Sequence, residues 1–305
     1  MDLQFQVAGH PGGISLLDGG TRIVKLTSKY EADFYEQVQK AASAETGTTG
    51  PFTRLLALMP SYHGSQPASE EPNGSDKQNT AVAIENLTHG FVHPNVLDIK
   101  LGSQLWDERA TVEKRDRMDA AARSTTSWTD GIRLTGWQVW DNAAQCAIPT
   151  SKAFGKTIVT EMLPTGVRLF FGCANNDDWN EFMTIVTAAG EEAPAQAPVA
   201  LPHLHVAELL KSFILPQLKL AADLASHLEV RMRGGSLLVV YEGDSNTLAS
   251  RLSTWTASGS AIPVANVKLI DFAHARLAQG EGPDEGVLKG LQTVVSLVED
   301  LLQRL

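Results

Sequence analysis

Nine residues, from Pro94 to Gly102, constrain the fold of this chain more than any other stretch; their sequence is P-N-V-L-D-I-K-L-G. Asp98 and Lys100 stand two positions apart inside an apolar run that is typical of a β-strand. Because successive side chains on a strand point to opposite faces, the two charged groups share one face, and Leu97 and Ile99 occupy the other. A carboxylate and an ammonium group on one strand face can hold a sugar hydroxyl and an anionic oxygen side by side. The D-x-K pattern alone also fits an ordinary strand with a surface ion pair.

The composition limits the class of protein. The chain has 305 residues, of which 43% are hydrophobic and 20% are charged, as is typical of a globular protein with a substantial core. This length corresponds to two ordinary domains or to one two-lobed enzyme. No apolar run approaches the roughly 20 residues that a membrane helix needs, and the N-terminus does not resemble a secretory signal. The two cysteines form neither a disulfide framework nor a metal cluster, so we expect an intracellular, reducing location.

For the question of which ligands the chain can bind, the distribution of charge along the sequence is more informative than the net charge. A net charge of −10 argues against a general binder of nucleic acid or of membrane surfaces. It would also repel a substrate with many phosphates, unless basic residues are concentrated locally. The segment Arg109–Arg123 holds five basic and three acidic residues, a local charge of +2. This segment is either a phosphate-binding surface or a solvated helix face.

A second polar position follows a strand-like run near the C-terminal end. The sequence from Val267 to His274 is V-K-L-I-D-F-A-H, and Asp271 ends its apolar part. A carboxylate at the end of a buried strand is costly unless it is satisfied, and a divalent cation can satisfy it. This block lies about 170 residues beyond Asp98.

Together, the two blocks resemble the inositol polyphosphate kinase family. The family signature P-x-x-x-D-x-K-x-G is present at Pro94, Asp98, Lys100 and Gly102, and V-K-L-I-D-F-A-H is similar to the family's metal-binding "IDF" segment. The resemblance implies a two-lobed, kinase-like fold of the α+β class, related to ATP-grasp proteins, with an antiparallel sheet in the N-terminal lobe and mixed α+β structure in the C-terminal lobe. It implies an ATP-binding lobe at residues 1–87 and a C-terminal lobe at 88–305, which includes a helical inositol-phosphate-binding insertion at about 105–125. The chain lacks the H-R-D and G-x-G-x-x-G motifs of protein kinases.

The resemblance also assigns residues to ATP and Mg²⁺. Lys25 matches the lysine of the α- and β-phosphates, and Glu31, in E-x-x-F-Y, is its expected partner, with Asp33 as the second candidate. Glu85 and Leu87 take the hinge position, where only their backbone groups pair with adenine.

Two further carboxylates complete this ATP and Mg²⁺ site. Asp98 is expected to accept from the ribose hydroxyls, and Asp271 is expected to hold Mg²⁺ against the β- and γ-phosphates.

A further set is expected to meet the inositol phosphate. Lys100 faces both the γ-phosphate and the acceptor hydroxyl, and with Asp271 it forms the expected catalytic pair. Lys114 takes the position of a substrate-binding lysine, and Arg117 can add a phosphate contact, because a guanidinium pairs with phosphate oxygens through two hydrogen bonds. His274 is expected close to the acceptor, although a histidine there also fits a plain surface position. No residue is assigned as general base.

A third block narrows the subgroup. The pattern G-x-R-x-x-G-x-Q, at Gly131, Arg133, Gly136 and Gln138, is typical of the family's fungal and hexakisphosphate-kinase-like members, and we interpret it as structural. The chain length favours a fungal-type multikinase, which acts on inositol tris- and tetrakisphosphate, over a hexakisphosphate kinase, which makes pyrophosphates. Inositol trisphosphate 3-kinases differ after the "IDF" aspartate.

Other functions stay open at this point. The alternatives are a non-catalytic scaffold for transcription or signalling partners, and activity on phosphoinositide headgroups. For the kinase we expect a monomer in the nucleus, the cytoplasm or both, without direct nucleic-acid binding or stable membrane association.

Periodicity predicts the remaining elements. We expect β-hairpins within residues 1–27, and strands at 55–62, 80–87, 236–242 and 267–271. We expect helices at 30–44, 111–123, 203–233 with a break at Pro216, and 287–302. Loops are expected at 66–79, 190–202 and 243–261.

Overall fold

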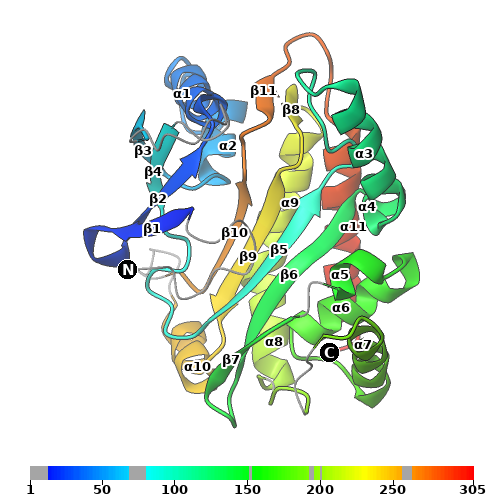
Figure 1. Cartoon of the computed structure of the whole chain (residues 1–305). Coiled ribbons are helices and arrows are strands. Elements are labelled where there is room, and N and C mark those ends of the chain that lie inside the picture. The colour runs from blue at the N-terminus through cyan, green and yellow to red at the C-terminus, as the bar shows by residue number, and fades with distance from the viewer. Residues whose placement is uncertain (1–12, 69–79, 151–152, 192–195, 200, 256–262) are drawn as a thin grey trace.

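Two larger antiparallel sheets, a two-stranded sheet and their helices make up the described part of the protein (Figure 1). The computed structural model describes residues 13–68, 80–150, 153–191, 196–199, 201–255 and 263–305. The N-terminal sheet has the order β1-β2-β4-β3, with β1 (Ile14–Leu17), β2 (Arg22–Thr27), β3 (Tyr62–Pro67) and β4 (Thr80–Glu85). The central sheet has the order β10-β9-β5-β6-β7, with β5 (Pro94–Leu101), β6 (Ile132–Asp141), β7 (Cys146–Pro149), β9 (Ser236–Glu242) and β10 (Ala265–Ile270). The α+β class is confirmed.

Helices flank both sheets. Beside the N-terminal sheet lie α1 (Lys29–Ser43) and α2 (Pro51–Ala57). The later helices are α3 (Val112–Arg123), α4 (Thr126–Asp130), α5 (Phe154–Thr157), α6 (Leu163–Phe170), α7 (Asn176–Ala188), α8 (His203–Leu209), α9 (Leu215–Ala225), α10 (Ser245–Thr254) and α11 (Glu285–Leu302). A π-helical turn, Leu210–Ile214, joins α8 to α9, and β8 (Val230–Met232) pairs with β11 (Ala275–Leu277). No helix in the described ranges has both the length and the apolar content to cross a membrane.

Most predicted elements are confirmed, but residues 55–62 and 243–261 differ. Of the run predicted as a strand, residues 55–57 belong to α2, residues 58–61 lie between elements, and Tyr62 begins β3. The helix forms because Gly50 and Pro51 begin it and the Glu45 carboxylate accepts hydrogen bonds from its first backbone N–H groups, those of Phe52 and Thr53. The predicted loop at 243–261 contains α10, which starts where the Asp244 side chain accepts from Thr247 N at 2.8 Å.

One further helix differs from the prediction, and three predicted regions are only partly described. The predicted helix at 203–233 ends at Ala225 and gives way to β8. The hairpin prediction for residues 1–12 and most of the loop predictions at 66–79 and 256–261 lie outside the described residues, as do residues 192–195 and 200 of the loop predicted at 190–202.

The two faces of the central sheet differ in chemistry. On β5, Val96, Asp98 and Lys100 point to one side, which we call the front face. Leu97, Ile99 and Leu101 point to the other, the back face, where they join the main hydrophobic core with side chains of α11. In Figure 1, α9 and α11 lie behind the sheet on this side. The alternation predicted for the strand is therefore confirmed.

A β-bulge changes which residues of β6 reach the front face. Asp98 pairs with Gly136, but Ile99 pairs with Leu134, so Thr135 is an extra residue on β6. As a result, Lys100 pairs with Arg133 rather than with Leu134. Leu134 instead enters the core, where it is 1% exposed.

Close backbone contacts fix the start of β6. Gly131 O accepts from Gly102 N at 2.8 Å, and Gly131 has a φ of +69°. A Cβ atom on Gly290 of α11 would lie 2.3 Å from Gly131 O, and one on Gly131 would lie 2.7 Å from Gly290 N. Neither position can carry a side chain without moving α11 away from β6.

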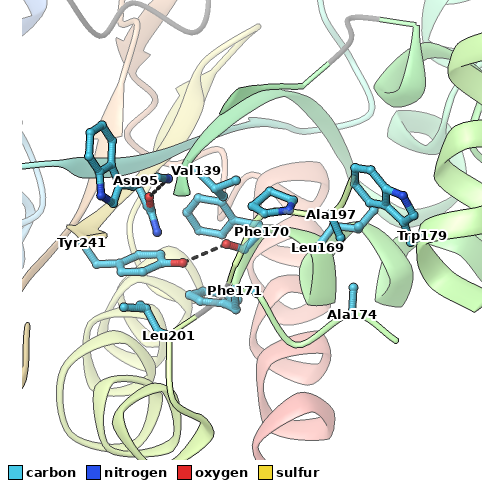
Figure 2. Close-up of a pocket in the computed structure, with 13 residues that line it drawn as sticks. Asn95, Val139, Leu169, Phe170, Phe171, Ala174, Trp179, Ala197, Leu201 and Tyr241 are labelled. Atoms are coloured by element: carbon cyan, nitrogen blue, oxygen red, sulfur yellow. Dashed lines mark hydrogen bonds between the residues drawn. The ribbon is translucent and has the colours of Figure 1, made fainter. Parts of the chain in front are cut away.

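The back face contains a hollow near β7 (Figure 2). Five of its lining side chains are aromatic. Tyr241 Oη donates to Phe170 O at 2.8 Å, and Asn95 Oδ1 accepts from Trp140 N at 2.6 Å, whereas Trp140 Nε1 has no partner among the described residues. None of the thirteen described lining residues is acidic or basic. This hollow therefore lacks groups that could act on a phosphate, and the candidate site lies on the front face.

Candidate active site

The front face changes in character along β5 and β9. At the Pro94 end, a small apolar cluster consists of Phe91, Val96, Leu238 and Val240. Further along, Asp98 pairs with Leu238, and Lys100 pairs with Ser236. The strand pair thus offers an apolar surface at one end and charged groups at the other.

Lys25 of β2 lies between two carboxylates. Its Nζ atom donates to Glu31 Oε1 at 2.9 Å and to Asp271 Oδ1 at 2.7 Å. Glu31, in the first turn of α1, is fully buried and accepts from Thr27 Oγ1 at 2.6 Å and from Phe272 N at 3.2 Å. Burial would lower the pKa of Lys25, but the charges of Glu31 and Asp271 outweigh this effect and raise the pKa. Lys25 is therefore a permanent cation fixed from two directions.

Asp271 follows β10 in a strained backbone conformation. Its φ is +66°, in the left-handed region, and such strain is concentrated at functional sites. Its side chain is 39% exposed. Burial would raise its pKa, but the charges of Lys25 and Lys100 and the hydrogen bond from Lys25 lower it, so the carboxylate is ionised at neutral pH.

These properties of Asp271 suit a metal ion that is shared with a ligand. In the described residues, no group of three or more His, Cys, Asp or Glu side chains could hold a metal ion. Mg²⁺ in phosphotransferases is commonly held by one or two carboxylates together with substrate phosphates. An ionised, partly exposed carboxylate such as that of Asp271 fits this kind of site.

Asp98 is a buried carboxylate with an unused acceptor. It is 4% exposed, and its Oδ1 atom has no hydrogen-bond partner within the described chain. Burial raises its pKa to about 6; the Lys100 charge opposes this rise, and the Asp271 charge adds to it. A buried polar atom without a partner costs about 1–3 kcal/mol. A bound molecule that donates to Oδ1 would remove this cost.

Lys100 and Arg133 face each other as directly paired residues of β5 and β6. Like charges placed directly across a strand pair destabilise a sheet. Lys100 Nζ donates to Gly234 O at 2.7 Å, whereas no partner of the half-buried Arg133 guanidinium is found among the described residues. Burial lowers the pKa of Arg133, and the nearby Asp98 opposes that change. An anion bound between these two cations would relieve their repulsion.

The predicted hinge offers fewer free backbone groups than expected. Glu85 N donates to Ser61 O at 2.9 Å, and Leu87 O accepts from Asn266 Nδ2 at 2.8 Å. The N–H of Leu87 has no acceptor within the described part of the chain. Of the Leu87 backbone groups, the N–H is therefore the one left to a ligand.

The predicted substrate residues lie apart from this group. His274 contacts Asp107, with 2.7 Å between its Nδ1 atom and Asp107 Oδ2. Lys114 and Arg117 lie on α3, the first half-buried and the second exposed. No hydrogen bond or ion pair of the described residues joins these two side chains to Lys100 or to each other, so both cations are available to a ligand.

Sequence reasoning missed the surroundings of two site residues. Arg133 was recognised within a motif and interpreted as structural, because alternation shows that it leaves the core but not that a bulge places it opposite Lys100. Asp107 gave no signal, because its partner His274 is 167 residues away in the chain. For Lys25, the structure brings Glu31 into contact, whereas the alternative Asp33 is exposed.

Comparisons with known proteins identify the family and the fold. A family model described as inositol polyphosphate kinase matches residues 81–189 and 200–299. Inositol polyphosphate multikinases of Saccharomyces cerevisiae and Schizosaccharomyces pombe are 27% and 28% identical, over 97% and 98% of this chain and 96% and 97% of theirs. The crystal structure of the S. cerevisiae inositol phosphate multikinase with ADP and Mn²⁺ superposes with a TM-score of 0.68 at 27% identity, covering 93% of this chain and 100% of that chain.

The fold and the site define a phosphotransferase built on two antiparallel sheets. The chain belongs to the inositol polyphosphate kinase family.

Proposed function

We propose that this kinase is a multikinase, which uses ATP and Mg²⁺ to phosphorylate hydroxyls of inositol tris- and tetrakisphosphate. The observation that carries the proposal is the pair of cations Lys100 and Arg133 on the front face. No carboxylate is hydrogen-bonded to either among the described residues, and the ionised Asp271 lies close enough for its charge to interact with Lys100. A transferring phosphoryl group is stabilised by positive charge around its oxygens, and paired cations beside a metal-binding carboxylate can supply that charge.

We place the nucleotide along the front face, with its adenine at the apolar end and its phosphates at the charged end. Adenine packs on the apolar cluster around Val96 and pairs with Leu87 N–H. The ribose donates to Asp98 Oδ1, which has no partner in the part of the chain that the structure describes. Lys25, held by Glu31, meets the α- and β-phosphates. The ADP and Mn²⁺ in the structure of the yeast relative support a nucleotide and a divalent cation here.

Asp271 would hold the Mg²⁺ ion, which supplies positive charge to the β- and γ-phosphates when it is bound. Lys25 now donates to Asp271, so binding exchanges this contact for contacts to the nucleotide. At 2.7 Å, Lys25 Nζ and Asp271 Oδ1 are close enough for each charge to compensate the other.

Transfer then depends on alignment and charge neutralisation. Lys100 is two positions along β5 from Asp98 and lies at the charged end of the front face, where it meets the γ-phosphate and the acceptor hydroxyl. Arg133 adds a second cation to the same anion. Lys114, Arg117 and His274 bind the phosphates and hydroxyls of the acceptor.

The specificity of a multikinase is supported by the extent of the similarity. The chain covers nearly the whole length of the yeast multikinases. It covers 52% of the mouse inositol hexakisphosphate kinase 3, at 24% identity. A hexakisphosphate kinase that makes pyrophosphates is therefore the second candidate. A scaffold without catalysis is disfavoured, because Lys25, Asp98, Lys100 and Asp271 are all present.

We extend the proposal to organisation and location. The ATP-binding lobe comprises residues 1–87 and the second lobe 88–305, with the inositol phosphate at the insertion of about 105–125. The protein works as a monomer in the nucleus, the cytoplasm or both, without direct nucleic-acid contacts or stable membrane association.

The decisive experiment offers ATP, Mg²⁺ and a panel of inositol phosphates, from tris- to hexakisphosphate, and resolves the products by position. We expect phosphorylation of the tris- and tetrakisphosphates, and loss of that activity in Lys100→Ala. Lys219→Ala is the matched control, because Lys219 is an exposed lysine paired with Glu299. Product from hexakisphosphate alone would favour the second candidate, and equal rates for wild type and Lys100→Ala would reject the proposal.

A further inference from the structure

Asp107 is a buried carboxylate in the segment between β5 and α3 that receives several donors. Its side chain is 5% exposed. Oδ2 accepts from Arg109 Nε at 2.8 Å, from Arg109 Nη2 and from the His274 ring at 2.7 Å, and Oδ1 accepts from Arg109 N at 3.2 Å. Burial would raise the pKa of Asp107, but the hydrogen bonds from Arg109 and His274 outweigh burial and lower it.

This carboxylate determines which nitrogen of His274 is available. An ionised carboxylate can only accept, so the contact of 2.7 Å requires the proton to lie on Nδ1 of His274. The requirement is the same for the neutral and the charged ring. Nε2 is then the nitrogen left for another molecule, and the His274 side chain is 40% exposed.

Arg109 holds this pair in place from two further elements. Its guanidinium stacks on the Tyr30 ring of α1, with 3.6 Å from Cζ to the ring centroid. Its Nη2 atom donates to Ala273 O at 3.3 Å. Tyr30 directly precedes Glu31, and Ala273 lies two residues after Asp271. The cluster of Asp107, Arg109 and His274 is therefore tied to the backbone on both sides of the Lys25 network.

We propose that Asp107 is a positioning residue for the acceptor: it fixes His274 so that Nε2 meets a hydroxyl or phosphate oxygen of the inositol phosphate, while Arg109 holds both side chains against α1 and the segment after β10. The inference rests on the proposed function, because it requires the acceptor to lie at His274. It adds to that function a residue from a different segment, which acts on the substrate only through His274.

The first test is Asp107→Asn. A carboxamide can turn its NH₂ group toward Nδ1 and favour the tautomer with the proton on Nε2, which presents the wrong group to the acceptor. We expect kcat/KM for inositol trisphosphate to fall about 10–100-fold, the range seen when an orienting partner of a histidine ligand is removed. The KM for ATP should stay within about twofold of wild type. An unchanged kcat/KM for the inositol phosphate would overturn the proposal.

A double-mutant cycle separates positioning from a general structural role. If Asp107 acts through His274, Asp107→Asn costs nothing further in a His274→Ala background, so the double variant matches His274→Ala. Losses that multiply would show that Asp107 acts independently of the ring and would overturn the proposal. Asp223→Asn is the matched control, because Asp223 pairs with Arg54 on the surface and should leave kcat/KM unchanged.

A measurement on the wild-type protein covers the case in which Asp107→Asn does not fold. The ring ¹⁵N and ¹H resonances of His274, assigned by comparison with His274→Gln, should show Nδ1 protonated. A neutral ring with its proton on Nε2 would overturn the proposal without any variant at Asp107. Failure of the proposed function is seen separately, as a wild-type protein that phosphorylates no inositol phosphate.

Discussion

The front and back faces of the central sheet are made by the same strands but have different roles. On the back face of β5, Leu97 and Ile99 are buried in the main core, and the nearby Tyr241 hydroxyl has its acceptor inside the protein. On the front face, Asp98 Oδ1 has no hydrogen-bond partner among the described residues, and Arg133 stands opposite Lys100. One face therefore stabilises the fold, and the other retains groups that destabilise it until a ligand arrives.

The comparison also shows that a hollow alone does not identify a functional site. The back-face hollow in Figure 2 is lined by aromatic side chains whose polar atoms include satisfied groups such as Tyr241 Oη. The front face is recognised instead by charges without matching partners. Four substitutions can test this distinction.

The largest effect is expected for Lys100→Ala. Removal of this cation from the charged end of the front face should lower kcat/KM about 10³-fold, as for other groups that stabilise charge in a transition state. The free energy of unfolding should change little, because within the described ranges the Lys100 side chain makes a single hydrogen bond, to Gly234 O. Steady-state kinetics and thermal unfolding of the same preparation check both parts. A large loss of stability would contradict the separation of the two faces.

The opposite result is expected for Leu97→Ala on the back face. Leu97 is 2% exposed, and the cavity left by its side chain should cost about 2–5 kcal/mol of unfolding free energy. Urea denaturation measures this cost. At low temperature, where the variant is still folded, kcat should remain close to that of wild type. A kcat that falls as far as in Lys100→Ala would break the comparison.

Asp98→Asn should stabilise the metal-free protein while it impairs the enzyme. Because burial raises the pKa of Asp98 from 3.8 to about 6, the folded state holds its proton more tightly than the unfolded chain does. Ionisation therefore destabilises the fold, fully above pH 6 and not at all below pH 3.8. The substitution should add up to about 3 kcal/mol at pH 7.5, and the gain should shrink as the pH falls toward 4. Unfolding in the presence of a chelator, at pH 7.5 and near pH 4, measures the gain in unfolding free energy. A gain that grows as the pH falls would contradict the predicted direction.

The smallest effect is expected for Arg133→Lys. The charge opposite Lys100 is retained, but the planar group that binds an anion through two hydrogen bonds is lost. We expect kcat/KM for inositol trisphosphate to fall about tenfold, with unchanged stability. For Arg133→Ala, measured in the same assay, kcat/KM should fall further than for Arg133→Lys. Identical values for the two variants would show that the charge of residue 133 does not contribute.

The sequence was informative where structure is local. The strand from Pro94, its alternation and the helix at α1 follow from short-range periodicity and are confirmed. Residues 55–62 were predicted wrongly, because an apolar run of that length suits a buried helix as well as a strand, and the start at Gly50 and Pro51 decided the outcome.

The site was harder to predict where it depends on distant pairing. Lys25 and Glu31 are six residues apart and could be paired from sequence. The meeting of Lys100 with Arg133 depends on a one-residue bulge at Thr135, which reverses the faces of the residues before it. The contact of Asp107 with His274 joins segments that only the tertiary fold brings together.

The contact between Gly131 and Gly290 has a consequence for the interpretation of natural variants. Arg133 lies two residues beyond Gly131, on the strand whose start is held against α11 with no room for a methyl group. A Gly290→Ala change would push α11 and this strand apart and so displace Arg133 from Lys100. A genetic screen for lost kinase activity should therefore recover Gly290 alongside Lys100, although the change at Gly290 removes no functional group and only replaces a hydrogen atom by a methyl group.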